Sequence, residues 1–214
     1  MTSAHVIAFV LIILIIVFFL CLGKWSNLLR DSIDDPAAFM ACVPAKYKGK
    51  TIDQIPHPFS LARTQLAMWT TIIACSYVYL YFSVGCDAMT INKTALILMG
   101  VSVATTAAGS IIDKSQSQAN AAASAGTDSP PAQARHQNCS SDGLITDMIS
   151  DGDGVNIHRF QNVVWTVISM TIYVYAVVQT TKNSCALPTL DDTLLAISGI
   201  SNATYVGLKI NENK

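Results

Sequence analysis

"RTQLAMWT" (Arg63–Thr70) and "RFQNVVWT" (Arg159–Thr166) carry Arg, Gln, Trp and Thr at the same spacing, 96 positions apart. The likeness extends beyond these motifs. Residues 60–83, shifted by 96 positions, share eight identities in 24, and residues 85–109, shifted by 99, share eight in 25. Unrelated apolar stretches would share about two or three. The chain therefore contains an internal duplication, and this duplication determines the fold that we expect.

The composition is that of a membrane protein. Of the 214 residues, 51% are hydrophobic and only 13% are charged, whereas a soluble domain carries about a quarter charged residues. The mean hydropathy is +0.42, and the apolar residues are clustered. The lipid bilayer is therefore an expected partner. The net charge of −1 gives no reason to expect nucleic acid as a partner.

Five segments contain no Asp, Glu, Lys or Arg and are predicted to span the membrane: Val6–Leu22, Thr64–Gly85, Thr94–Ile112, Phe160–Thr181 and Thr193–Leu208. A spanning helix needs about 17 to 25 such residues, and the first four segments qualify. The fifth is short and contains Asn202, but in the duplication it corresponds to the third. We therefore expect an all-α transmembrane fold of five helices.

The first segment is predicted to be a retained anchor, because residues 1–5 contain no Lys or Arg and no small-x-small cleavage site precedes Lys24. The other four segments form two tandem helical hairpins, one in each repeat, which enter the membrane in the same direction. The expected symmetry is a pseudo-twofold axis along the membrane normal.

The placement of Lys and Arg predicts the orientation. With five spans, only Lys93 and Lys182 lie on one side, and every other Lys and Arg lies on the side of the first loop, the central linker and the C-terminus. The N-terminus is therefore expected outside the cell and the C-terminus in the cytoplasm.

The expected organisation has five parts: an anchor at 1–22, a cytoplasmic loop at 23–57, hairpin repeat 1 at 58–113, a cytoplasmic linker at 114–154 and hairpin repeat 2 at 155–214. The linker is rich in Ala, Ser and Gln and is expected to be largely disordered. A short helix is expected near 143–150, with Leu144, Ile145, Met148 and Ile149 on one face.

Each repeat opens with an Arg, a Gln and a Trp near the predicted cytoplasmic boundary: Arg63, Gln65 and Trp69, then Arg159, Gln161 and Trp165. Arginine stems can follow a helix while their guanidinium groups reach headgroups, and tryptophan near the interface is an anchor. A glutamine one turn inside needs a hydrogen-bond partner. We interpret these residues as boundary anchors and interhelix contacts. The alternative is that they recognise a ligand.

The second helix of each hairpin carries small residues at every fourth position: Gly100, Ala104, Ala108 and Gly199, Ala203, Gly207. This pattern predicts close helix packing. Four hydroxyl side chains on the same helices are predicted to bond between helices, namely Ser102, Thr105, Ser201 and Thr204. The alternative is that these hydroxyls line a water-filled path.

Three motifs resemble those of a family of uncharacterised bacterial multi-span membrane proteins. They are a Ser-Leu-x-Arg-x-Gln-x-x-x-Trp start at Ser60–Trp69, a His-Arg-Phe-Gln start at His158–Gln161, and a Gly-Ile-Ser-x-x-Thr-Tyr-x-Gly-x-Lys end at Gly199–Lys209. The resemblance covers most of residues 58–209. It implies a bacterial cytoplasmic (inner) membrane location and no particular function.

Catalytic, cofactor and metal sites are not predicted, because no nucleophile–base pair, metal quartet or phosphate-binding glycine loop is present. "DGDGVNIH" (Asp151–His158) fails as a calcium loop, since Asn162 stands at the twelfth position where Glu is required. A solvated turn that caps the next helix is expected. No span carries a charge away from its ends, which disfavours proton-coupled transport.

These features favour a non-enzymatic membrane scaffold, anchor or assembly subunit, whose partner would be a second copy or a cytoplasmic protein. The alternative is a homo-oligomeric channel with an uncharged pore, lined by Ser and Thr of the second helix of each hairpin.

The duplication also relates two of the six cysteines. Cys86 and Cys185 occupy equivalent positions in loops predicted to lie outside, where disulfides form. We expect a bond between them, provided that their Cα atoms come within about 7 Å. If the loops lie further apart, two free thiols or an intermolecular bridge would result.

Overall fold

The N-terminal apolar stretch forms one unbroken helix, α1 (Ser3–Trp25), of 23 residues. At about 1.5 Å per residue it can cross a hydrocarbon layer of about 30 Å. Only Ala8 on this helix is fully buried. A stripe that includes Leu11, Ile15 and Phe19 is half-buried, and the large apolar side chains on the other faces are exposed. The helix ends with Lys24 and Trp25, and the Trp25 side chain is 77% exposed, as is typical of an interfacial tryptophan.

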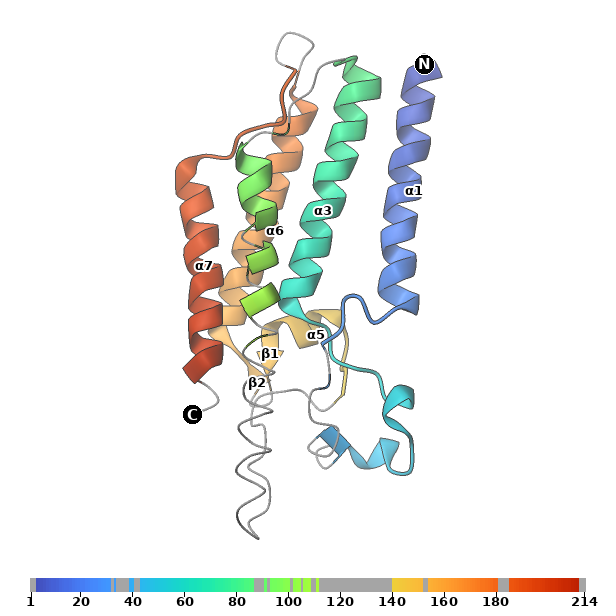
Figure 1. The fold of residues 1–214 in the computed structure, drawn as a ribbon, viewed down its shortest axis with the longest axis vertical. Helices are drawn as coiled ribbons and strands as arrows, with labels where there is room; N and C mark the ends of the chain where they lie inside the picture. Colours follow the sequence, from blue (N-terminus) through green and yellow to red (C-terminus); the bar gives the residue numbers. More distant parts are fainter. Residues whose placement is uncertain are drawn as a thin grey trace.

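The computed structural model describes residues 3–31, 33, 39–40, 43–86, 91, 93–100, 102–104, 106–108, 111, 140–151, 154–180 and 185–211. In this part α3 (Leu61–Tyr79), α6 (Ile157–Val178) and α7 (Asp192–Asn211) run side by side along the long axis, with α1 beside α3 (Figure 1). The N-terminus lies at one end of this bundle, and the chain ends toward the other (Figure 1).

The structure is mostly helical, and three of its described helices are long and apolar enough to cross a membrane. They are α1, α6 and Leu61–Val84, which is α3 with its extension. The other two predicted spans are also helical, over Lys93–Ala108 and in α7. The first is apolar but shorter than the three spanning candidates. The second, α7, is less apolar because it begins at Asp192 and contains Asn202 and Lys209.

A π-helical turn, η3 (Leu80–Val84), extends α3 and ends at Gly85. Gly85 has φ 79° and ψ 46°, the left-handed conformation that a side chain disfavours. The backbone N–H of Cys86 then donates to the Leu80 carbonyl at 3.2 Å. This wide last turn fixes the direction in which the chain presents Cys86.

The core joins α3, the helix Lys93–Ala108, α6 and the segment before α7. Its buried members are Trp69, Ile73, Leu80, Ala95, Leu98, Met170, Tyr173, Val177, Leu187 and Leu190. Because these residues come from both halves of the duplication, the two repeats share one core instead of packing as separate units.

Hydrogen bonds connect three segments at the end of the bundle where α1 ends and α3 and α6 begin, which we call the lower end (Figure 1). We call these segments the collar: residues 26–31, 55–60 and 140–151. The backbone N–H of Ser60 donates to the Leu29 carbonyl at 2.8 Å, and that of Ser141 donates to the Pro56 carbonyl at 2.8 Å. Two short 3-10 helices, η1 (Ala45–Tyr47) and η2 (Ile52–Gln54), lie between the first two segments.

The short helix expected near 143–150 is α5 (Leu144–Ile149), but its buried residue is Asp147. Of the expected apolar face, Leu144 and Ile145 are 43% and 74% exposed, whereas Met148 and Ile149 are half-buried. The reason is that the Asp147 carboxylate bonds inward, which turns the first apolar residues outward.

The turn before α6 is a small hairpin of β1 (Ser150–Asp151) and β2 (Gly154–Val155), an element absent from the all-α prediction. The Asn156 side chain accepts a hydrogen bond from the His158 backbone N–H at 2.9 Å and caps α6. The expected capping turn is therefore present. The predicted disordered linker falls mostly on residues 112–139, outside the described part.

Candidate functional site

Buried amide side chains meet between α3 and α6, about one turn inside the lower ends of both helices. The Gln65 side chain is 4% exposed and that of Asn162 is 1% exposed. The Nε2 of Gln65 donates to the Asn162 Oδ1 at 2.7 Å and to the Thr166 Oγ1 at 2.8 Å. The Nδ2 of Asn162 donates to the Asn202 Oδ1 of α7 at 3.2 Å. We call these four residues the polar cluster.

Helix periodicity explains the cluster. Asn162 and Thr166 are four residues apart and share one face of α6, so both acceptors point at the same Gln65 amide. In hydrocarbon an unpaired amide is costly. The cluster therefore fixes the register of three helices, α3, α6 and α7, relative to one another.

A small cavity adjoins the polar cluster. It is lined by Gln65, Trp69, Ile97, Leu98, Ser102, Thr166, Leu195 and Asn202, and its volume is about 10 Å³. This is room for about one water molecule. Residues of α3, the helix Lys93–Ala108, α6 and α7 line the cavity, but it is too small for a metabolite.

The two copies of the opening motif occupy different environments. Trp69 is buried, and its ring meets the Tyr173 ring edge-on at a centroid distance of 6.0 Å. Trp165 is half-buried and Gln161 is exposed. Gln161 is the copy of Gln65, but on α6 the next residue, Asn162, is the buried one. One residue along a helix is a rotation of about 100°, so the buried face of α6 is rotated by that angle relative to the repeat. Trp69 therefore makes one of the predicted interhelix contacts, with α6, and Gln161 does not repeat the contact of Gln65.

Arg63 and Arg159 are both half-buried at the lower starts of α3 and α6. The Arg63 guanidinium donates to the Arg30 backbone carbonyl at 2.9 Å. The Arg30 guanidinium in turn donates to the His57 carbonyl and lies 4.4 Å from the centroid of the Phe59 ring.

Among the described residues, the small-residue faces around Gly100 and Gly199 do not bring helices together. Gly100, Ala104 and Ala203 are exposed, while Ala108 and Gly199 are half-buried. A Cβ added to Gly100 or Gly199 would meet nothing within 4 Å. The packing interpretation is therefore wrong for these glycines, because the buried face of each helix lies elsewhere. The surroundings of Gly207 lie outside the described part.

The hydroxyl residues of the second helices also differ from expectation. Ser102 is buried, but its hydroxyl donates to the Leu98 carbonyl of its own helix at 2.9 Å. Thr204 is exposed. Thr105 and the side chain of Ser201 lie outside the described residues.

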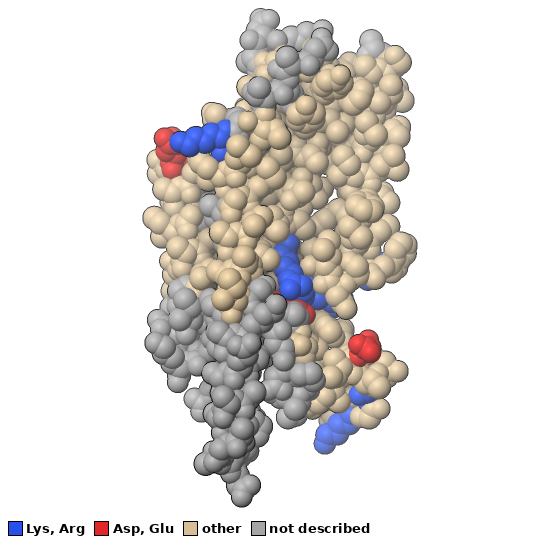
Figure 2. Space-filling model, viewed as in Figure 1, with Lys and Arg blue, Asp and Glu red and all other residues tan. Residues whose placement is uncertain are grey.

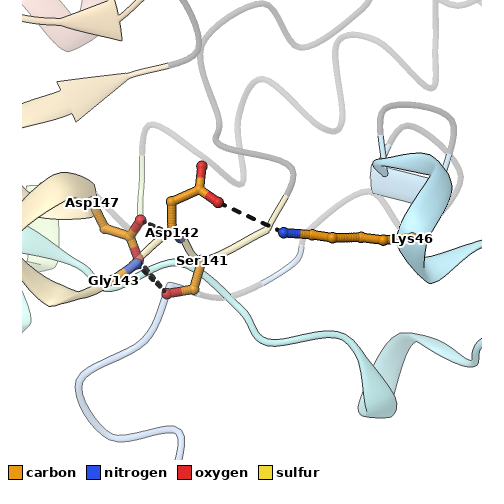
Figure 3. Close-up of polar contacts among 5 residues, drawn as sticks. All are labelled: Lys46, Ser141, Asp142, Gly143 and Asp147. Carbon is orange, nitrogen blue, oxygen red and sulfur yellow. Dashed lines mark hydrogen bonds and ion pairs between the residues drawn. The ribbon is translucent and has the colours of Figure 1, made fainter.

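Asp147 is the buried acidic group of the collar, with a side chain 1% exposed. Its Oδ2 accepts from the Phe59 N–H at 3.0 Å and from the Ser141 hydroxyl at 2.6 Å, and its Oδ1 accepts from the Asp142 N–H at 3.0 Å. Figure 3 shows this carboxylate beside Ser141, and the ion pair of Lys46 with Asp142, at 3.9 Å, further out. Asp147 thus ties α5 to the start of α3.

No family model matches this chain, and neither a search of curated proteins nor one of solved structures found a match. Inference about function therefore rests on the geometry described here.

At the upper end of the bundle the structure joins Cys86 and Cys185 in a disulfide, with the two Cα atoms 5.4 Å apart. Cys86 follows the π-turn of α3, and Cys185 follows α6, so the bond connects the two repeats. Cys21 and Cys75, on the spanning helices, are free.

The polar cluster is neutral, so it can hold a water or fix helix positions, but it offers no acid, base or nucleophile. In the part of the chain that the structure describes, no group of three or more His, Cys, Asp or Glu could hold a metal ion. Sequence reasoning missed Asn162, Thr166, Asn202 and Asp147 as contacts. A signal was available for Asn162 and Asn202, because amides inside apolar segments need partners.

Proposed function

We propose that this protein is a non-enzymatic structural subunit of a bacterial cytoplasmic membrane, a scaffold or anchor for other components. Its expected orientation has the N-terminus and the disulfide outside, and the collar and the C-terminus in the cytoplasm. Two features support this orientation. The disulfide lies at the end opposite the collar, and oxidising conditions outside the cytoplasm favour such bonds.

The observation that carries the proposal is the filled interior of the bundle. Apolar side chains from both repeats occupy the core, and the polar cluster bonds with itself. The cavity beside it has room for about one water. A path for ions through this bundle would need to break the bonds of Gln65, so the geometry favours a rigid scaffold over a pore within one chain.

The charges on the surface support a membrane setting. On the face drawn in Figure 2, Lys, Arg, Asp and Glu gather at two levels, and the rest of the described surface is uncharged. At the collar end Lys46 and Asp142 are exposed and form an ion pair. At the other end Lys93, Asp191 and Asp192 are exposed.

Ion flux tests the scaffold against a channel formed by several copies. The full chain, purified with its disulfide intact, is reconstituted into liposomes, and K⁺ and Cl⁻ flux is compared with that of empty liposomes. We expect no difference. Selective flux that Gln65→Leu changes would overturn the scaffold proposal and favour the oligomeric channel.

Reporter fusions test the orientation separately. A reporter that is active only in the cytoplasm should work after Lys214, and one active only outside should work beside Ser184. An outward C-terminus would contradict the five-span arrangement that we propose.

A further inference from the structure

The collar end of the bundle holds two arginines in fixed positions with most of their hydrogen-bonding capacity unused. Arg30 follows α1 by five residues, and Arg63 lies in the first turn of α3. The structure links them directly, since the Arg63 guanidinium donates to the Arg30 carbonyl at 2.9 Å. Both arginines therefore lie where α1 ends and α3 begins, joined through the backbone of Arg30.

Both guanidinium groups are held by neutral contacts. Arg30 donates to the His57 carbonyl and stacks on the Phe59 ring, and Arg63 donates to a backbone carbonyl. Each guanidinium carries five N–H donors, and each bond described uses only one nitrogen, Nη1. Both residues are half-buried, so each keeps part of its surface accessible while its guanidinium group is held by these contacts.

The nearby carboxylates do not neutralise the pair. Asp147 bonds the Phe59 N–H, but its side chain is 1% exposed, and its oxygens accept from Phe59, Ser141 and Asp142. Asp31 is half-buried beside Arg30 in the sequence. Among the residues that the structure describes, neither Arg30 nor Arg63 has a carboxylate oxygen within 4.0 Å.

The level of the pair is that of lipid headgroups. Lys24 and Trp25, with an exposed indole ring, end the spanning helix α1, and tryptophan and lysine favour the membrane interface. We propose that Arg30 and Arg63 together bind the phosphate of an anionic phospholipid in this leaflet. The planar fork of a guanidinium matches phosphate oxygens, and Lys24 adds positive charge nearby. This inference rests on the proposed function only for the orientation, which decides the membrane leaflet that the two arginines face.

Native mass spectrometry of the full chain in detergent tests this site. The chain is titrated with phosphatidylglycerol and, separately, with phosphatidylcholine carrying the same acyl chains. We expect the wild type to prefer phosphatidylglycerol. Arg30→Gln and Arg63→Gln should each weaken phosphatidylglycerol binding about fivefold, the factor that corresponds to about 1 kcal/mol for each arginine near an anionic surface.

Arg159→Gln is the matched control, because Arg159 starts α6 as Arg63 starts α3 and the substitution removes the same charge. We expect this control to change phosphatidylglycerol binding less than twofold. Equal binding of both lipids to the wild type would overturn the proposal. So would an equal loss in Arg159→Gln, because the attraction would then depend only on net charge.

Two further measurements test the guanidinium geometry and the source of the phosphate. Arg63→Lys keeps the charge but loses the planar fork, so its affinity should lie between those of the wild type and Arg63→Gln, even if Arg63→Gln folds poorly. Inorganic phosphate at millimolar concentration should not displace phosphatidylglycerol; full displacement would assign the site to a soluble phosphate. Flux in liposomes would refute the scaffold proposal and leave the lipid site standing.

Discussion

At the scale of single residues, an identity shared by two repeats does not guarantee a shared environment. Gln65 is buried and bonds two acceptors, whereas its copy Gln161 is exposed. The difference comes from Asn162, which occupies the position on α6 that faces α3. Once Asn162 and Thr166 provide acceptors for Gln65, α6 has no buried place for a second glutamine.

Substitutions of Gln65 and of its copy Gln161 give a direct test of the polar cluster. Gln65→Leu removes two hydrogen bonds and leaves the Asn162 and Thr166 acceptors without their donor, so the free energy of unfolding should fall by about 1 to 2 kcal/mol. Gln161→Leu, on the exposed copy, should change it by less than about 0.5 kcal/mol. Unfolding of both variants in mixed micelles measures the difference. Equal effects would show that the cluster does not stabilise the bundle.

The Tyr173 hydroxyl is buried and has no hydrogen-bond partner among the described residues. A buried unpaired hydroxyl carries a desolvation cost. Tyr173→Phe keeps the ring that packs on Trp69 and removes that cost. Its thermal unfolding temperature should therefore equal or exceed that of the wild type. A fall of several degrees would mean that the hydroxyl bonds a group outside the described residues.

At the scale of elements, a glycine's role depends on its backbone conformation and its neighbours. Gly85 has a positive φ at the end of the π-turn. Gly100 and Gly199 are helical and adjoin open space. The spacing of small residues in the sequence predicted a structural role for Gly100 and Gly199. In the structure, the glycine with the constrained backbone conformation is Gly85.

Gly85→Ala should destabilise the chain by about 1 to 2 kcal/mol, since a Cβ is disfavoured in the left-handed conformation. Gly100→Ala is the matched substitution, and it should be neutral or slightly stabilising because alanine favours helices. Thermal unfolding of both variants checks this prediction. A tolerated Gly85→Ala would mean that the π-turn can rearrange.

Gly100→Leu tests the exposed small-residue face. A leucine there meets open space in the single chain, so the yield and the unfolding temperature should match those of the wild type. The molecular mass of the complex in detergent, measured by light scattering, supplies a second readout. A changed mass with an unchanged unfolding temperature would show that this face packs against a second copy.

At the scale of the whole molecule, the two ends of the bundle are fastened differently. The Cys86–Cys185 disulfide joins the two repeats at one end, and hydrogen bonds of the collar, including those of Asp147, join three segments at the other. Between these ends the shared core and the polar cluster hold the helices. The molecule is therefore constrained along its full length.

Removing the disulfide should lower stability, because it links residues 99 positions apart. The chain-entropy estimate for a loop of about 100 residues is about 4.7 kcal/mol, an upper value here because the membrane already restricts the unfolded chain. The double variant Cys86→Ser with Cys185→Ser should unfold at a lower temperature than the wild type. Added reductant should lower the wild-type temperature equally and leave the variant unchanged; a shift in the variant would implicate another cysteine.

The sequence by itself determined the membrane setting, the helical character and the duplication. Composition, apolar runs and repeat spacing suffice for these, because each depends on the local chain and the solvent around it. The repeat also placed Cys86 and Cys185 at equivalent positions, and the structure joins them in a disulfide.

Only the tertiary structure decided which face of each helix is buried. A shift of one residue turns a helix by about 100°, and the bonds of Asn162, Thr166 and Asn202 set that turn in α6. The same holds for Asp147, whose donors include Phe59, 88 positions away in the sequence. Periodicity shows that a helix has several faces, but the partner that each face meets depends on contacts between distant segments.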